Sequence, residues 1–192
     1  MEGNGFHFVD VSEGDWRQLR GAWLDMVGAR SADDLESLDD ALARTESAWR
    51  ELARNLTDTD CFGQALVDDS GCWLGFVTGY LDELALDRNV FVTHVHALDG
   101  DLETEALLLD RVAEWAGVQV ADSVVVGIRE DCVDLLRRFE DHGFRRTGVR
   151  RRSELGVGEA EIELSLALAA LMLPRGGTDS AMRQRSPSGL QH

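Results

Sequence analysis

The segment 123–128, SVVVGI, restricts the possible folds of this chain more than any other part of it. A strand with one face in water alternates apolar and polar side chains, whereas a strand buried on both faces is apolar almost throughout. This segment has the second pattern. We therefore expect it to be a strand in the interior of a sheet rather than at its edge.

The spacing of apolar residues elsewhere predicts a mixture of helices and strands. Four segments with helical spacing are 15–30, 37–55, 101–116 and one that begins at Asp131 and ends before Gly143. Further segments with strand-like composition are 6–11, 61–83 and 88–97. Within 61–83 the polar run DDSG, which starts at Asp68, predicts a turn, so this segment is expected to form a β-hairpin.

The last part of the chain divides into a hairpin and a polar tail. FRRTGVRRRSEL and AEIELSLAL are separated by the turn sequence GVGE and predict two paired strands. From Pro174 onward the chain is rich in glycine and serine and has few apolar residues. We expect residues 1–173 to form a single domain and residues 174–192 to be a disordered tail.

The net charge of the chain limits its partners. It carries 36 acidic and 19 basic residues, for a formal charge of -17. Such a surface repels phosphate backbones and anionic lipid headgroups, so neither nucleic acid nor a membrane is an expected partner. The acidity either attracts a cationic substrate or only provides a solvated surface.

Cysteine usage and the N-terminal sequence predict a cytoplasmic protein. The three cysteines, Cys61, Cys72 and Cys132, are far apart, and an odd number cannot be fully paired within the chain. The first residues, MEGNGFHFVDVSEGD, lack the basic and apolar regions of a signal peptide. The longest apolar stretch, 162–173, is interrupted by polar residues and is too short to cross a bilayer.

The order of these elements resembles that of the GNAT family of N-acetyltransferases over residues 5–168. The most specific segments are HVHALDGDLETEALLLDRVAEWA and SVVVGIREDCVDLLRRFEDHGF. In the family the corresponding segments contain a V-x-P strand end, an R-x-x-G-x-G/A loop, a helix ending in W-A, an N-x-x-A-x-x-L-Y helix and a terminal G-F. Val95, Trp115–Ala116 and Gly143–Phe144 match this framework.

The resemblance implies an α/β (α+β) fold with a central, mixed but mostly antiparallel sheet and helices on both faces. It also implies acetyl-CoA or another acyl-CoA as cosubstrate, a small-molecule or peptide amine as acceptor, and a possible homodimer. The positions that correspond to the family's cofactor site are Val95, Ala97, Gly100, Asp101, Leu102, Glu103, Thr104, Glu105, Cys132 and Phe139.

Several of these positions depart from the family's chemistry. The family binds the CoA diphosphate with backbone N–H groups at a helix N-terminus, which glycines let the phosphates approach. Here Gly100 stands where the family has arginine or glutamine, and Glu103 and Glu105 stand at its two glycines. The alternative role of such carboxylates is to cap the helix.

The helix that begins at Asp131 also departs from the family's pattern. The family's tyrosine, which often protonates the leaving thiolate, falls on Phe139, and a phenyl ring has no proton to give. The family's asparagine falls on Cys132. An arginine cluster at residues 145, 146 and 150–152 either offsets nearby carboxylates or replaces the missing phosphate contacts.

His94 and His96 are the candidate catalytic residues. Two positions apart on a strand, their side chains point to one face about 7 Å apart. With a reference pKa near 6.5, a histidine at this strand end suits a general base. Zinc binding and ordinary hydrogen-bonded histidines are the alternatives, and since no second cluster supplies further ligands we expect no metal.

Two functions of different classes follow. The first is an N-acyltransferase that moves an acetyl or other acyl group from acyl-CoA to a cationic amine, with His94 or His96 as base. The second is a non-catalytic binding or regulatory protein of the GNAT fold that has lost acyl-CoA binding.

Overall fold

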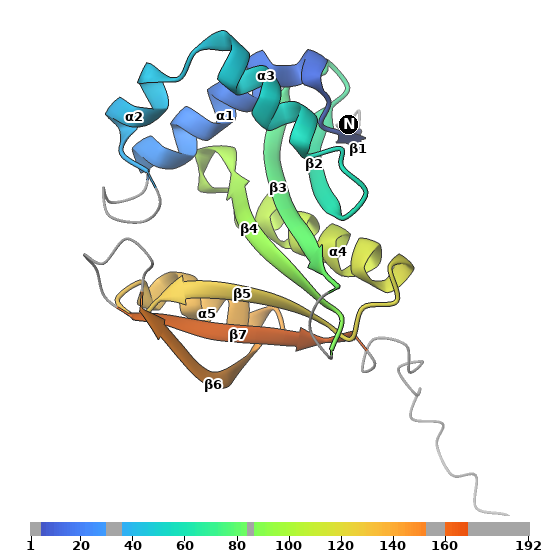
Figure 1. Ribbon diagram of the computed structural model, residues 1–192, viewed down its shortest axis with the longest axis vertical. Coiled ribbons are helices and arrows are strands. Elements are labelled where there is room, and N and C mark those ends of the chain that lie inside the picture. The colour runs from blue at the N-terminus through green and yellow to red at the C-terminus, as the bar shows by residue number, and fades with distance from the viewer. Residues whose placement is uncertain (1–4, 30–35, 84–86, 153–159, 169–192) are drawn as a thin grey trace, which may run out of the picture.

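The computed structural model describes residues 5–29, 36–83, 87–152 and 160–168 (Figure 1). Its helices are η1 (Glu13–Asp15), α1 (Trp16–Ala29), α2 (Leu38–Ala43), α3 (Glu46–Asn55), η2 (Leu98–Gly100), α4 (Leu102–Val118) and α5 (Val133–Asp141). Its strands are β1 (Phe6–Asp10), β2 (Cys61–Asp68), β3 (Trp73–Asp82), β4 (Asn89–Ala97), β5 (Ser123–Arg129), β6 (Arg145–Arg152) and β7 (Ala160–Ala167). The predicted tail, 174–192, and the turn between β6 and β7 lie outside the described residues.

The strands form one seven-stranded sheet in the order β1-β2-β3-β4-β5-β7-β6. Only β4 and β5 pair in parallel, and every other neighbouring pair is antiparallel. The sheet is therefore mixed and mostly antiparallel, as predicted. The apolar segment 123–128 lies in β5, which has β4 and β7 as neighbours on its two edges.

Two apolar cores lie on opposite faces of the sheet. One joins α1, α2 and α3 to the sheet through Trp23, Trp49 and Phe76. The other joins α4 and α5 to it through Leu108, Phe139 and Val124. Helices thus cover both faces, which confirms the predicted layers (Figure 1).

The second predicted helix is two helices. A single helix over residues 37–55 was expected, but the chain extends at Arg44, where ψ is 133°, and starts again as α3. The Thr45 hydroxyl accepts a hydrogen bond from the Ala48 N–H and so caps the new helix. The apolar spacing continues across the break, which is why the sequence pattern did not reveal it.

Strands β4 and β5 separate after a short paired stretch, and this separation positions the site. Only residues Asn89–Val92 of β4 pair with β5, and their partners are Ser123–Val126. Just beyond it, the register between β3 and β4 shifts so that Thr93 has no partner, which is a β-bulge. The end of β4 therefore turns away from β5 towards α1 (Figure 1).

Candidate functional site

A cavity of about 300 Å³ lies where the end of β4 leaves the sheet. Five of the residues singled out from the sequence line it, namely Val95, His96, Ala97, Gly100 and Glu105. Four residues that were not among the predicted site residues complete its lining, namely Asp25, Ala29, Asp99 and Arg138. The structure thus gathers five of the twelve predicted site residues around the β4 end, with α1, α4 and α5 as its walls.

His96 is held by Asp25 of α1. Its Nε2 lies 2.7 Å from Asp25 Oδ2, across 71 positions of sequence. The imidazole is buried, whereas half of the Asp25 side chain is exposed. A carboxylate in this place fixes the orientation of the ring, which is what a general base requires. No sequence signal marked Asp25: it is the one acidic residue of α1, and its partner His96 is distant in the sequence.

His94 takes part in a different set of contacts. Its Nδ1 lies 3.0 Å from the Thr78 hydroxyl oxygen. The centroid of its ring lies 4.3 Å from the centroid of the Trp23 ring. Both histidines face the α1 side of the sheet, as the strand spacing predicted. Only His96 reaches the cavity, so the structure favours it over His94 as the residue that can act there.

The turn from β4 into α4 is built for capping by a carboxylate. Asp99 and Gly100 have φ values of 59° and 68°, so a glycine at the second position satisfies a left-handed backbone. Asp101 is the N-cap residue, and its Oδ2 accepts a hydrogen bond of 2.9 Å from the Thr104 N–H. Hydrogen bonds from the Thr104 side chain and backbone, then from Glu103, hold the pKa of Asp101 below its ordinary value.

Glu105 and Arg138 connect α4 to α5 across the same region. The Arg138 guanidinium donates a hydrogen bond of 2.7 Å to Glu105 Oε2, and the carboxylate is largely buried. Both residues also line a second cavity, of about 280 Å³, whose other walls include Leu102 and His142. The ion pair therefore stands between the cavity at the β4 end and the space between α4 and α5.

The remaining predicted cofactor residues lie away from the cavity at the β4 end. Phe139 is fully buried and packs edge-on against Phe144 in the core. Cys132 precedes α5 as its N-cap and contacts the same core. Leu102, Glu103 and Thr104 belong to the first turn of α4, and of these only Leu102 lines a described cavity.

The arginine cluster on β6 is engaged by carboxylates of neighbouring elements. Arg146 contacts Glu140, Arg150 contacts Glu130, and Arg151 contacts Glu163. These pairs favour the interpretation in which the arginines offset nearby acidic residues. Across the described ranges no group of three or more His, Cys, Asp or Glu side chains is arranged to hold a metal ion. Nor does any helix there have the length and apolar character needed to span a bilayer.

Comparison with known proteins identifies the fold. No family model and no curated protein matches the sequence. Among solved structures, an acetyltransferase of the GNAT family from Streptococcus pneumoniae aligns with a TM-score of 0.68 at 13% identity, over 85% of this chain and 99% of its own. An N-acetyltransferase from Staphylococcus aureus aligns with a TM-score of 0.67 at 8% identity, over 86% and 99%.

A spermidine N-acetyltransferase from Vibrio cholerae aligns with a TM-score of 0.63 at 13% identity, over 88% of this chain and 96% of its own. These likenesses, together with the sheet order and the separation of β4 and β5, show that the chain has the GNAT fold. The resemblance seen in the sequence is thereby confirmed at the level of the fold.

The residues at the α4 N-terminus do not fit an acyl-CoA diphosphate. The cap position is taken by the Asp101 carboxylate, Asp99 precedes it in η2, and Glu103 and Glu105 follow in the first turn of α4. Two like charges about 4 Å apart repel by about 1 kcal/mol in water and about 4 kcal/mol near a protein surface. A micromolar ligand has only about 8 kcal/mol of binding free energy in total, so a few such repulsions remove most of it.

Proposed function

We propose that this protein is a GNAT-fold binding or regulatory protein that does not use acyl-CoA. The observation that carries the proposal is the hydrogen bond from the Thr104 N–H to the Asp101 carboxylate. In the GNAT family, as the sequence resemblance implies, the corresponding backbone N–H groups bind phosphate. Here a side chain of the protein already provides the negative charge that the helix N-terminus attracts.

The ion pair between Glu105 and Arg138 supports the same proposal. Both of its residues line the cavity at the β4 end and the cavity between α4 and α5. An extended ligand that ran from the β4 end into the space between these helices would have to break it. Breaking a pair whose carboxylate is buried carries a desolvation cost that an anionic ligand beside Glu105 would not offset.

The second candidate is an N-acyltransferase that acts on a cationic amine. It is favoured by the cavity at the β4 end, where Val95 and His96 come together, and by the acetyltransferases that share the fold. One of them is a spermidine N-acetyltransferase, and an acidic surface suits a polyamine. In this candidate His96, oriented by Asp25, would accept the proton of the amine.

Thermal unfolding with and without acetyl-CoA separates the two candidates. A ligand present at about a hundred times its dissociation constant stabilises the folded state by about 2.7 kcal/mol. We expect no change in the melting temperature with millimolar acetyl-CoA, propionyl-CoA or a longer acyl-CoA. A GNAT acetyltransferase with the full glycine loop, measured in parallel, serves as the positive control. A clear rise for this protein would support the acyltransferase instead.

A further inference from the structure

The helix α4 ends in a motif that favours glycine at a position where this chain has valine. The Ala121 N–H donates a hydrogen bond of 3.0 Å to the Ala116 carbonyl. The Val120 N–H donates one of 3.1 Å to the Gly117 carbonyl. These two bonds define a Schellman motif, in which the residue after the C-cap has a left-handed backbone and is usually glycine. Val120 holds this position with a φ of 54°, which is rare for a β-branched residue.

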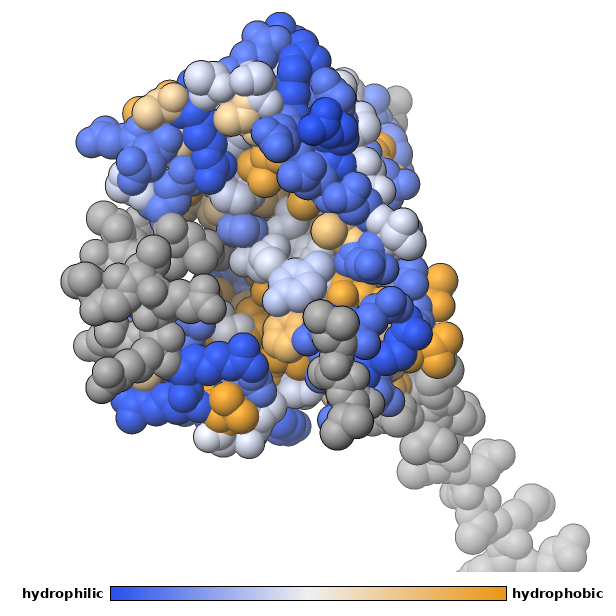
Figure 2. Space-filling view, viewed as in Figure 1, coloured by the Kyte–Doolittle hydropathy of each residue, from blue (hydrophilic) through white to orange (hydrophobic). Residues whose placement is uncertain are grey.

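Val120 and the nearby Val118 are also exposed to solvent. They are 77% and 78% exposed, the highest values among the large apolar residues that the structure describes. Neither belongs to one of the two apolar cores. Figure 2 shows apolar surface at the edge of the molecule where α4 ends, whereas the surface over α1 to α3 is mainly hydrophilic. We call Val118 and Val120 the valine pair.

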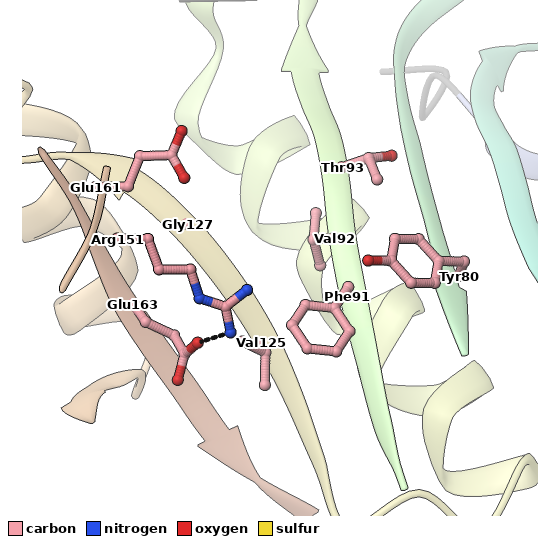
Figure 3. A pocket seen from close by; sticks show the side chains of 9 residues that line it. All are labelled: Tyr80, Phe91, Val92, Thr93, Val125, Gly127, Arg151, Glu161 and Glu163. Carbon is pink, nitrogen blue, oxygen red and sulfur yellow. Dashed lines mark hydrogen bonds and ion pairs between the residues drawn. The ribbon is translucent and has the colours of Figure 1, made fainter. Parts of the chain in front are cut away.

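Exposure alone does not indicate a docking surface, as Tyr80 shows. This residue is 42% exposed, but its ring stacks on that of Phe91 with centroids 5.5 Å apart (Figure 3). Single exposed apolar residues are common on protein surfaces. Val120 differs because its side chain also strains the backbone, and glycine would adopt the same conformation without strain. A contact with another apolar group would offset this cost.

The chain leaves the sheet beside the valine pair. The Leu168 N–H, at the end of β7, donates a hydrogen bond of 3.1 Å to the Asp122 carbonyl. Asp122 lies two residues after Val120. Leu168 is buried in the same apolar core as Ala121, which completes the motif at the end of α4. The ends of β7 and α4 therefore lie close together.

The sequence that follows Leu168 is apolar. Residues 169–173 read AALML, without a charged or polar side chain, and precede Pro174. They lie outside the described ranges. An extended chain advances by at most about 3.6 Å per residue, so Leu171 lies up to about 11 Å from Leu168. Two residues, from Asp122 back to Val120, span about 7 Å at most. Leu171 and the residues after it can therefore reach the valine pair.

We propose that residues 171–173 dock on the valine pair and link the end of β7 to the end of α4. Their three side chains, those of Leu171, Met172 and Leu173, would cover the two valines. Removal of this apolar surface from water is favourable and would offset the strain at Val120. The tail that begins at Pro174 would then start from a fixed place on the domain.

This docking surface is distant from the cavity at the β4 end. Gly100 and Glu105 line that cavity at the start of α4, whereas the valine pair lies at the end of the helix. A helix of 17 residues is about 25 Å long. The inference goes beyond the proposed function, and the two fail separately. Acetyl-CoA binding would leave the docked segment in place, and a free segment would leave the acyl-CoA argument untouched.

Methyl NMR of the full chain, labelled with ¹³C in its valine, leucine and methionine methyl groups, tests the contact. We expect nuclear Overhauser effects between the valine pair and residues 171–173. We also expect the amide hydrogens of residues 171–173 to exchange at least about tenfold more slowly than those of an unstructured chain. Absence of the Overhauser effects would overturn the proposal. So would effects that arise only between a labelled and an unlabelled chain in a mixed sample, because a second copy would then supply the segment.

A double variant assigns the contact to the apolar side chains. Leu171→Asp combined with Leu173→Asp should shift the methyl signals of the valine pair and abolish the slow exchange. Leu190→Asp makes the same change further along the chain and should leave both as they are. Each variant must first show the wild-type spectrum in the far ultraviolet. Unchanged valine signals in the double variant would contradict the docking.

Val120→Gly separates the strain from the contact. In the background with both aspartates, glycine relieves the strain and removes no contact, so the urea midpoint of unfolding should rise. In the wild-type background the same change also removes a side chain on which the segment docks, so the midpoint should rise less or fall. Equal rises in both backgrounds would show that Val120 and the segment are not coupled and would overturn the proposal.

Discussion

Glu105 of α4 and Arg138 of α5, 33 positions apart in the sequence, form an ion pair of 2.7 Å that stands between two cavities. The carboxylate is largely buried, while more than a third of the arginine side chain is exposed. The two partners therefore depend on each other unequally. Without the arginine, the buried carboxylate would lose its charged partner. Without the carboxylate, the guanidinium could instead be hydrated.

This asymmetry predicts different costs for the two single variants. Arg138→Met leaves a buried carboxylate alone and should lower the free energy of unfolding by about 1 to 3 kcal/mol, discounted for the exposure of the arginine. Glu105→Gln should cost less, because the guanidinium can be solvated. Urea unfolding of both single variants and of the double variant gives the coupling energy. Equal costs with no coupling would contradict this account.

The Asp101 cap predicts an acid-dependent contribution to stability. The pKa of Asp101 is lowered in the folded protein by its hydrogen bonds with Thr104. Its stabilisation is therefore fully present above the ordinary aspartate pKa, about 3.9, and is lost as the pH falls through the lowered folded value. Asp101→Asn should have a lower free energy of unfolding than the wild type at neutral pH. The difference between the two free energies should shrink as the pH falls.

Urea unfolding at a series of pH values from neutral to strongly acidic tests this expectation. Asp39→Asn, at an exposed position of α2, is the matched control and should show no comparable convergence with the wild type. A difference between wild type and Asp101→Asn that stays constant across the acid range would show that the carboxylate does not act as the cap.

The contact between Asp25 and His96 predicts which imidazole nitrogen carries the proton. A carboxylate only accepts hydrogen bonds, so Nε2 must be the protonated nitrogen when it faces Asp25 Oδ2 at 2.7 Å. Long-range ¹H–¹⁵N correlation spectra should show the Nε2–H form of His96 at neutral pH. In Asp25→Ala this preference should weaken. A dominant Nδ1–H form in the wild type would contradict the arrangement.

The break between α2 and α3 predicts a role for one hydroxyl group. Thr45→Ala removes the acceptor for the Ala48 N–H and should lower the free energy of unfolding by about 1 kcal/mol. Thr45→Ser retains a capping oxygen and should lie close to the wild type. Chemical denaturation of the three proteins measures both values, and equal losses in the two variants would rule out the cap.

Much of the fold could be predicted because local patterns decide it. The apolar run of β5 requires a buried strand, and all of Val124, Val125, Val126 and Ile128 are buried. A helix was expected to end before Gly143, and α5 ends at Asp141, two residues before this glycine, whose φ is 108°. The Arg44–Thr45 break was missed, since a cap formed by one hydroxyl does not change the spacing of apolar residues on either side.

The candidate site was predictable only along one segment. Residues 95–105 belong to a strand end and a helix start that follow each other, so their proximity comes from the chain itself. Asp25 and Arg138 reach the same cavity from other helices, and nothing in their local sequence distinguishes them from other charged residues on helix surfaces.

We propose that the α4 N-terminus holds the Asp101 carboxylate of the protein itself instead of a diphosphate. Isothermal titration calorimetry of the full chain with acetyl-CoA tests it most directly, with a control titration into buffer. We expect heats that do not differ from those of dilution up to millimolar acetyl-CoA. A saturable binding curve that weakens as salt is added would contradict it, because it would show that the diphosphate is bound by charge in spite of Asp101 and its acidic neighbours.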